Sequence, residues 1–434
     1  MRDLTTDAVK NRPLPVVRNG FFAFLTQTFF IGMLVVPTTL QAPRGGLLLL
    51  IFMVAVFAAL AQSNRCWRVN RDIFLGWSVT VLVGIFGVFW GAINNAPGAL
   101  KVSTVYIFWP VLYLLFIGFA HDLSVIWRLQ VALIIGIVLA SLMSLALILA
   151  GVLGVGEVVF SLFAFQGAAF GSYDGFIEFR LFNLTTLMYG FPFLFSLLLA
   201  RRDSLRGWPR FGLWLLLATM FFAALASGRR MFWLVLLITP FVSLCLLQFS
   251  SKRLSITALL SGGSISVLLC ILIGGVAFFA LGLRPDSVFN EFVSAFLGQE
   301  ASSSARFEQA LALWDAFTRS PLIGHGLGAA VEVKRSVEMP WAYELSYLAL
   351  LMHVGMVGFL TYIGVIVLTF IKGIAISWKD ADFASSFVPL ATGLSVFLIM
   401  NATNPYLAKF DYLWVIFLPV ALINAHLTQK PANA

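Results

Sequence analysis

Two arginines, Arg229 and Arg230, form a short polar turn with Ser227 and Gly228 between two apolar runs. An arginine at a membrane boundary costs desolvation free energy unless an anion or a headgroup pairs with it. Its planar guanidinium carries N–H donors in a fork that matches the oxygens of a phosphate. The turn therefore predicts a clamp for an anionic group such as a lipid pyrophosphate. The alternative is that both side chains extend to the lipid headgroups.

Arg306 is the second candidate, because it accompanies a predicted amphipathic helix in the longest polar stretch of the chain. Residues 302–304 are serines that can cap this helix, and residues 305–317 have helical apolar spacing. Its N-terminus would favour an anion near Arg306, and such a helix can lie on a membrane surface. The alternative is a solvated arginine paired with Glu308 or Asp315. The predicted apolar face consists of Phe307, Ala310, Leu311, Trp314 and Phe317.

Glu344 lies in the segment Trp341-Ala-Tyr-Glu-Leu-Ser-Tyr347, where a long apolar run begins. A carboxylate at this boundary can accept the proton of a hydroxyl group as a general base. Neighbouring Tyr343 is a candidate for contact with the same substrate. The alternative is an interfacial charge within a belt of aromatic residues formed by Trp341, Tyr343 and Tyr347.

His325 lies in the glycine-rich segment Gly324-His-Gly-Leu-Gly328 and is a further substrate-binding candidate. The glycines indicate a turn, because no strand precedes them and no Gly-Lys-Ser/Thr motif follows, as a nucleotide loop would require. The four histidines of the chain are scattered without metal-ligand spacing. The sequence thus predicts no bound metal ion and no cofactor.

Two further candidates lie where polar segments meet apolar runs. Arg180 begins an apolar run and follows Asp174 and Glu178, so it either binds phosphate or pairs with those acids. Asn404 lies in Asn401-Ala-Thr-Asn-Pro-Tyr406, where an Asn-Pro pair interrupts the chain between two apolar runs. Its alternative interpretation is a simple turn.

The elements that position these residues are predicted to be membrane helices. Of the 434 residues, 60% are hydrophobic and 11% are charged, whereas soluble domains have about 25% charged residues. We therefore expect one all-α, polytopic membrane domain over residues 1–434, with about twelve spans of about 20 apolar residues each. The predicted spans are 19–37, 45–62, 73–93, 102–120, 129–152, 181–200, 211–227, 231–249, 254–283, 341–371, 383–401 and 412–428.

Lysines and arginines between the spans determine the expected orientation, because positive charge gathers in short cytoplasmic loops. The basic N-terminus and alternate basic loops fall on one face, which we assign to the cytoplasm together with both termini. The periplasmic face then carries a loop at 153–180, the Arg229-Arg230 turn and a large loop at 284–340 with short amphipathic helices. The net charge of +9 follows from this topology, so nucleic acid is not an expected partner.

Taken in order, several of these segments resemble the O-antigen ligase and polymerase superfamily of bacterial inner-membrane glycosyltransferases. The resemblance covers roughly residues 175–410. No single motif is specific, and the assignment depends on the order, spacing and shared face of the segments. They are Ser227-Gly-Arg-Arg230, Arg306 with Trp314, Ser320-Pro-Leu-Ile-Gly-His-Gly-Leu-Gly328, Tyr343-Glu-Leu-Ser-Tyr-Leu-Ala-Leu-Leu-Met-His-Val-Gly-Met-Val-Gly358 and Ala402-Thr-Asn-Pro-Tyr406.

The resemblance implies about twelve helices and a periplasmic loop that closes over a lipid-facing cavity. It also implies metal-independent transfer of a glycan from undecaprenyl pyrophosphate to an acceptor hydroxyl, on the periplasmic side of the bacterial inner membrane. By resemblance, Arg230 and Arg306 hold the pyrophosphate, with Arg229 and Arg180 as further candidates. The implied partners are undecaprenyl-pyrophosphate-linked oligosaccharides and membrane lipids, together with a flippase and a chain-length regulator.

Glu344 bears on which member of the superfamily the chain resembles. Ligases commonly have a histidine at this position, eleven residues before the glycine that is Gly355 here. The departure favours a polymerase of O-antigen or exopolysaccharide, which extends another lipid-linked repeat unit, over a ligase that transfers glycan to lipid A–core. A transporter is the alternative of another class. It would need charged groups near the membrane midplane, and the middles of the predicted spans nearly lack them.

Overall fold

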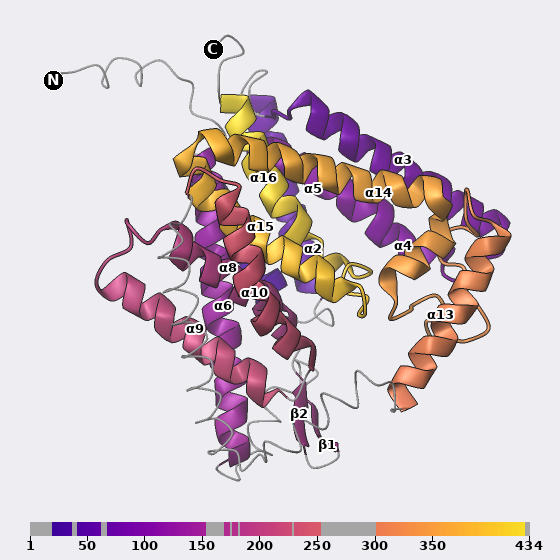
Figure 1. Cartoon of the computed structure of the whole chain (residues 1–434). Coiled ribbons are helices and arrows are strands. Elements are labelled where there is room, and N and C mark those ends of the chain that lie inside the picture. The colour runs from indigo at the N-terminus through magenta and orange to yellow at the C-terminus, as the bar shows by residue number, and fades with distance from the viewer. Residues whose placement is uncertain are drawn as a thin grey trace.

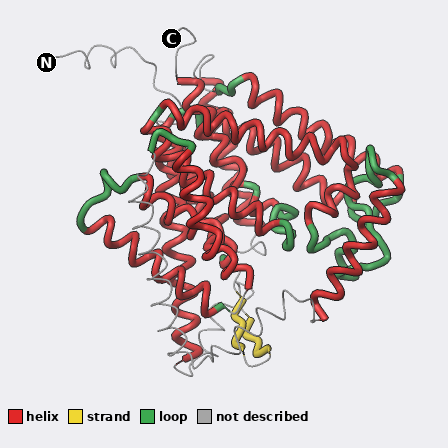
Figure 2. The backbone as a smooth tube through the Cα atoms, in the orientation of Figure 1, coloured by secondary structure: helices red, strands yellow, loops and turns green. Residues whose placement is uncertain are grey.

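The computed structural model describes residues 20–36, 41–61, 67–152, 169–173, 176–180, 183–227, 230–252 and 301–429. The described part of the chain is built almost entirely from helices (Figures 1 and 2). Its helical elements are α1 (Gly20–Val35), α2 (Gln41–Ala61), α3 (Arg71–Ile93), α4 (Ala99–Ser103), η2 (Thr104–Phe108), α5 (Trp109–Phe119), α6 (Leu123–Val152), α8 (Leu184–Ala200), α9 (Trp208–Ala226), α10 (Arg230–Gln248), α13 (Ala301–Arg319), α14 (Ser346–Lys379), α15 (Ala381–Asn401), η4 (Phe410–Tyr412) and α16 (Trp414–Gln429).

Seven helical segments in the described residues are long and apolar enough to cross a membrane. They are α3, the α4–η2–α5 unit, α6, α10, α14, α15 and the η4–α16 unit. Four shorter apolar helices lie within α1, α2, α8 and α9. The chain is therefore a multi-pass α-helical membrane protein, and every predicted span on described residues coincides with a helix. The predicted span at 254–283 lies outside the described residues.

Helix α8 forms the centre of the bundle, where it packs against α6, α9, α10 and α15 (Figure 1). Nearly all of its residues are buried, as expected for a helix that is apolar on every side. The Tyr189 hydroxyl donates a hydrogen bond to the carbonyl of Leu390 in α15 at 3.0 Å. A second contact joins the hydroxyls of Thr392 and Ser196 at 3.1 Å. Such bonds hold helices together where lipid supplies no hydrophobic driving force.

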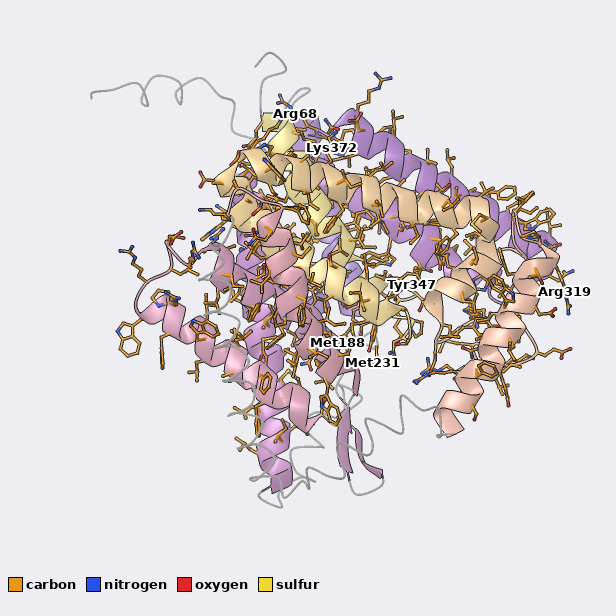
Figure 3. All side chains as sticks on the ribbon, viewed as in Figure 1. Arg68, Met188, Met231, Arg319, Tyr347 and Lys372 are labelled. Carbon is orange, nitrogen blue, oxygen red and sulfur yellow. The ribbon has the colours of Figure 1, made fainter. Side chains whose placement is uncertain are left out.

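Basic residues that we assign to the cytoplasmic face lie at one end of the bundle. Nζ of Lys372 in α14 lies 2.5 Å from Oδ2 of Asp72 in α3, close to the basic loop before that helix. Figure 3 shows Arg68 and Lys372 at this end, and Met231 and Tyr347 toward the other. The residues that border the predicted outer loops are thus separated from this basic end.

A β-hairpin replaces part of the predicted loop at 153–180. Strands β1 (Ala169–Tyr173) and β2 (Phe176–Arg180) form a two-stranded antiparallel sheet. The sequence of β2 is Phe-Ile-Glu-Phe-Arg, and its aromatic and β-branched residues favour an extended backbone. The hairpin lies within the predicted loop, and the predicted all-α class agrees with the described helices.

The long apolar run predicted at 341–371 folds as α14, which is broken at Gly355. This residue has φ 64° and ψ −173°, a conformation that glycine adopts and side-chain-bearing residues almost never do. The break leaves backbone N–H and C=O groups on both sides without their partners in the helix. Within a membrane, each such group must find another partner in the protein.

The segment 320–328 supplies these partners, and it includes the glycine-rich sequence that we predict to be a turn. The Leu327 N–H also donates to the carbonyl of Gly87 at 2.8 Å, so the segment lies against α3 as well as α14. This arrangement fixes α13, which directly precedes the segment, relative to the start of α14. The hydrogen bonds around the break run from Met356 N to Pro321 O (2.8 Å), Val357 N to Leu322 O (3.2 Å), His325 N to Met352 O (3.0 Å) and Gly326 N to His353 O (2.8 Å).

Candidate active site

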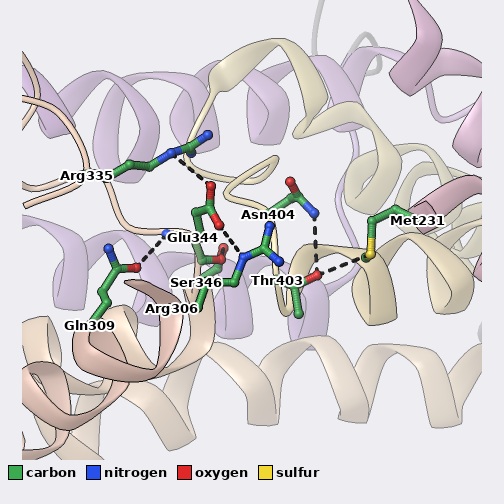
Figure 4. Close-up of polar contacts among 8 residues, drawn as sticks. All are labelled: Met231, Arg306, Gln309, Arg335, Glu344, Ser346, Thr403 and Asn404. Atoms are coloured by element: carbon green, nitrogen blue, oxygen red, sulfur yellow. Dashed lines mark hydrogen bonds and ion pairs between the residues drawn. The ribbon is translucent and has the colours of Figure 1, made fainter. Parts of the chain in front are cut away.

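A cluster of three charged side chains, Glu344, Arg306 and Arg335, lies just before α14 (Figure 4). Nε of Arg306, from α13, lies 2.5 Å from Oε2 of Glu344, and Nε of Arg335, from the loop before α14, lies 3.1 Å from Oε1. The Glu344 side chain is 19% exposed, whereas the two arginine side chains are 43% and 46% exposed. One carboxylate thus bridges two guanidinium groups that both remain accessible. We call these three residues the Glu344 cluster.

Packing of α13 against α14 determines the separation of Arg306 and Glu344. Leu313 of α13 is fully buried in an apolar cluster that includes Ala349 of α14. One turn after Arg306, the buried Gln309 side chain accepts the backbone N–H of Glu344 through Oε1 at 3.1 Å. The helix therefore fixes both the backbone and the carboxylate of Glu344.

Tyr343 holds the loop that carries Arg335. Its ring is buried, and its hydroxyl oxygen accepts the N–H of Val331 at 2.6 Å. Burial raises the pKa of the Tyr343 hydroxyl, so this group stays protonated at neutral pH. The predicted substrate-binding candidate Tyr343 thus lies next to Glu344 in sequence and, through Val331, contacts the loop that carries Arg335.

The N-terminal part of α13 differs from the prediction. Residues 302–304 lie inside the helix, which includes Ala301, so these serines do not cap it. Arg306 is consequently in the second turn, away from the first-turn amides that attract anions. Serine costs only about 0.5 kcal/mol relative to alanine inside a helix, which packing of the following turns readily offsets. The suggested partner Asp315 pairs with Arg319, and Arg306 pairs with Glu344.

The predicted apolar face of α13 is divided between two environments. Phe317 is buried against α14, as is Leu313, which we did not place on that face. Three other members of the predicted face are exposed: Phe307, Leu311 and Trp314. Helical spacing shows only that these apolar residues share one broad side of α13. The packing of α14 decides which part of that side is buried.

The Arg229-Arg230 turn is described only in part. Arg230 begins α10, whereas Arg229 and the side chain of Arg230 lie outside what the structure describes. The next residue, Met231, accepts a hydrogen bond through its sulfur from the hydroxyl of Thr403 at 3.5 Å. The start of α10 is therefore close to the loop after α15. Arg180 is the last residue of β2, and its side chain also lies outside the described residues.

The loop at 402–409, after α15, borders the Glu344 cluster. Asn404 lies in this loop, and its side-chain amide donates to the hydroxyl of the preceding residue at 3.4 Å (Figure 4). Desolvation by the surrounding protein lowers the pKa of Lys409, an effect that Asp411 opposes and Arg335 reinforces. Lys409 and Arg335 are thus close enough to repel each other. The cluster and this loop together have more positive than negative charge, which favours an anionic ligand.

His325 joins α13 to the segment 320–328. Its Nε2 lies 2.6 Å from the carbonyl oxygen of Ala316 in α13. The described polar contacts of His325 are with backbone groups, and Glu344 is not among them. The structure therefore gives this predicted candidate a position between α13 and α14, apart from the Glu344 cluster.

Arg335 and Gln309 belong to the site although neither was among the predicted site residues. Arg335 follows Lys334 in the loop that we predict to be periplasmic, and positive charge is disfavoured on that face. The signal that marked Arg229-Arg230 was thus present here too. Gln309 carried no comparable signal, because a neutral amide on a helix is equally compatible with solvent.

The chain matches no model of a known protein family, and no curated protein is significantly similar to it. Within the described ranges, no group of three His, Cys, Asp or Glu side chains is placed to hold a metal ion. The Glu344 cluster and the loops around it are therefore the candidate site. Chemically, its guanidinium groups can bind an anion, and its carboxylate can orient donors or accept a proton.

Proposed function

We propose that the chain is a polysaccharide polymerase that joins undecaprenyl-pyrophosphate-linked repeat units. The observation that carries this proposal is the Glu344 cluster, in which Arg306 and Arg335 converge on one carboxylate at the end of α14 nearest the predicted periplasmic loops. Arginine pairs with accessible N–H donors suit the oxygens of a pyrophosphate. The sequence resemblance supplies the class of donor, and the cluster supplies groups that such a donor requires.

The proposed reaction is a single inverting displacement. The acceptor sugar hydroxyl attacks the anomeric carbon of the donor glycan, so a new C–O bond forms as the bond to the pyrophosphate oxygen breaks. Undecaprenyl pyrophosphate leaves with the bonding electron pair. Glu344 orients the acceptor hydroxyl or takes its proton, a role that typically contributes about 100- to 10000-fold to the rate.

Arginines at this site act on the leaving group. Arg306 and Arg230, with Arg229 and Arg180 as further candidates, stabilise the negative charge that grows on the pyrophosphate as the bond breaks. Their guanidinium groups supply this stabilisation without a metal ion. Loss of one such preorganised donor typically costs about 3–4 kcal/mol, or a factor of about 100 to 1000 in turnover.

The same proposal includes the finer topology. About twelve helices cross the bacterial inner membrane, both termini are cytoplasmic, and the loop at 284–340 covers the active site on the periplasmic side. A flippase would deliver the lipid-linked unit to that side, and a chain-length regulator would set the extent of polymerisation. A ligase is the nearest alternative, and Glu344 in place of the ligase histidine argues against it.

The first experiment supplies the purified protein with lipid-linked repeat units and looks for a ladder of longer glycans. Arg306→Ala and Arg230→Ala are each expected to reduce polymerisation about 100- to 1000-fold. Arg319→Ala is the matched control, because Arg319 is an exposed arginine of the same helix that pairs with Asp315. Full polymerisation by both test variants at normal membrane levels would refute the role of these arginines.

The second experiment separates the alternatives. Offering lipid A–core and a lipid-linked repeat unit in parallel identifies the acceptor, and transfer to lipid A–core alone would assign the chain as a ligase. Uptake of small solutes into vesicles without any glycan transfer would instead support a transporter. Glu344→Gln with unchanged turnover would remove the base role of Glu344.

A further inference from the structure

The two arginines of the Glu344 cluster each use only part of their hydrogen-bonding capacity. Arg306 and Arg335 both reach Glu344 through Nε. Neither forms a hydrogen bond or ion pair with any other residue that the structure describes. A guanidinium also carries two terminal amino groups, Nη1 and Nη2, which bear most of its N–H donors. These amino groups are therefore left for another acceptor.

Contact through Nε has a geometric consequence. Because the guanidinium is planar and rigid, fixing its Nε edge on a carboxylate also fixes the direction in which the amino groups point. Glu344 is held in turn by Gln309, which accepts its backbone N–H, and its side chain is mostly buried. The carboxylate is thus the rigid member of the cluster, and the two partly exposed arginines are the members that can contact a ligand.

The charges of the cluster favour an anion. Two guanidinium groups and one carboxylate leave an excess of positive charge, and Lys409 lies close enough to Arg335 for the two charges to interact. Ligands with planar or tetrahedral sets of oxygens match paired guanidinium donors best. A phosphate or pyrophosphate satisfies both the charge and the geometry.

We propose that Arg306 and Arg335 together form a phosphate-binding site, with Glu344 as the positioning residue that holds both guanidinium groups by their Nε edges. The ligand is the pyrophosphate of the lipid-linked donor, so this inference rests on the proposed function and deepens it. It adds Arg335 to the substrate contacts. It also makes Glu344 a brace for the arginines, because Oε2 already accepts the Nε–H of Arg306 and Oε1 is ion-paired with Nε of Arg335.

Brace and base make different predictions for binding of the donor. Loss of a brace misplaces the arginines, which weakens phosphate binding and raises the KM for the lipid-linked donor in addition to any loss of turnover. Loss of a general base slows the chemical step, which lowers kcat and leaves donor binding intact. Glu344→Gln preserves shape and removes the charge, so it separates the two roles.

The direct test uses inorganic pyrophosphate and the full-length protein purified in detergent, with binding measured by calorimetry. We expect Arg335→Ala and Glu344→Gln each to weaken binding by roughly tenfold or more, in the range typical of lost supporting contacts. Arg335→Lys should also weaken it, because an ammonium cannot contact Glu344 and a phosphate through separate edges. Arg319→Ala serves as the control, and its binding should equal that of the unmodified protein.

Two results would overturn the inference. Unchanged binding in both Arg335→Ala and Arg335→Lys would exclude Arg335 from the site. Unchanged or tighter binding in Glu344→Gln would exclude the brace, and tighter binding would show that Glu344 competes with phosphate for the arginines. Circular dichroism and thermal unfolding of each variant test whether its helices are intact.

Failure of this inference is distinguishable from failure of the proposed function. A glycan ladder accompanied by pyrophosphate binding that does not depend on Arg335 would refute the brace and retain the polymerase. Arg335-dependent pyrophosphate binding without transfer from any lipid-linked donor would retain the phosphate site and refute the polymerase.

Discussion

Replacing Gly355 with alanine should destabilise the protein through the break in α14. Gly355 has φ 64°, and a Cβ built there would lie 2.3 Å from the carbonyl oxygen of Leu322 and 2.5 Å from the backbone N of Ile323. Both neighbours are backbone atoms, so no side-chain rotation relieves the contact. The Leu322 carbonyl is also the acceptor for the N–H of Val357 at 3.2 Å.

The loss of stability in Gly355→Ala is the sum of backbone strain at residue 355 and the weakened hydrogen bond from Val357 to Leu322. A side-chain-bearing residue in this conformation costs about 1–3 kcal/mol. Displacing the Leu322 carbonyl weakens one backbone hydrogen bond, worth about 1 kcal/mol. We therefore expect the free energy of unfolding to fall by about 2–4 kcal/mol. At about 2 °C per kcal/mol for a large domain, the apparent Tm should fall by roughly 4–8 °C.

Gly364→Ala provides the matched control in the same helix. A Cβ at Gly364 meets nothing within 4 Å, and alanine in a helix interior is favoured over glycine by about 0.5–1 kcal/mol. Tryptophan fluorescence during heating of both purified variants in one detergent measures the difference. If Gly355→Ala unfolded at the same temperature as Gly364→Ala, the contact between the segment 320–328 and the break in α14 would be wrong.

Two further predictions concern the surroundings of the Glu344 cluster. The exposed side chains of Phe307, Leu311 and Trp314 are expected to contact the outer leaflet of the membrane. Brominated lipids should therefore quench a larger fraction of the total tryptophan fluorescence in the unmodified protein than in the Trp314→Phe variant. Equal fractional quenching in the two proteins would place α13 away from lipid. Tyr343→Phe removes the acceptor of the Val331 N–H and should lower the free energy of unfolding by about 1–3 kcal/mol. Because burial raises the pKa of Tyr343, its hydroxyl is neutral in the folded state. The stabilisation that this hydroxyl provides should therefore persist at neutral pH and be lost only as the pH rises through that raised pKa. Thermal unfolding of both proteins between pH 7 and strongly alkaline pH checks this, and a difference that changed near neutrality would contradict it.

Helix positions were predictable because membrane insertion depends on local composition. Each apolar run on described residues folds as a helix, since a run of about 20 apolar residues has no better environment than the bilayer. The break in α14 was not predictable in the same way. Gly355 is one of 35 glycines, and its special conformation follows only from the approach of the segment 320–328.

The candidate site was predictable in part. Arg306 and Glu344 were each singled out by charge at a membrane boundary, but nothing in their local sequence paired them. The pairing of Arg335 with Glu344 was not predictable either, because Arg335 is nine residues before Glu344 in a loop without regular periodicity. The proposed contribution of Arg230 stays a prediction, because its side chain lies outside the described residues.

The sequence by itself determined the membrane-protein class, the helix positions and the short set of charged residues at boundaries. These properties depend on the free energy of transferring each segment into lipid, which is nearly local. Only the tertiary structure decided that Arg306 and Arg335 share Glu344, and that the segment 320–328 completes a broken helix. The physical reason is that each arrangement satisfies buried polar groups of one segment with groups of another, and the choice of partner depends on how the whole chain packs.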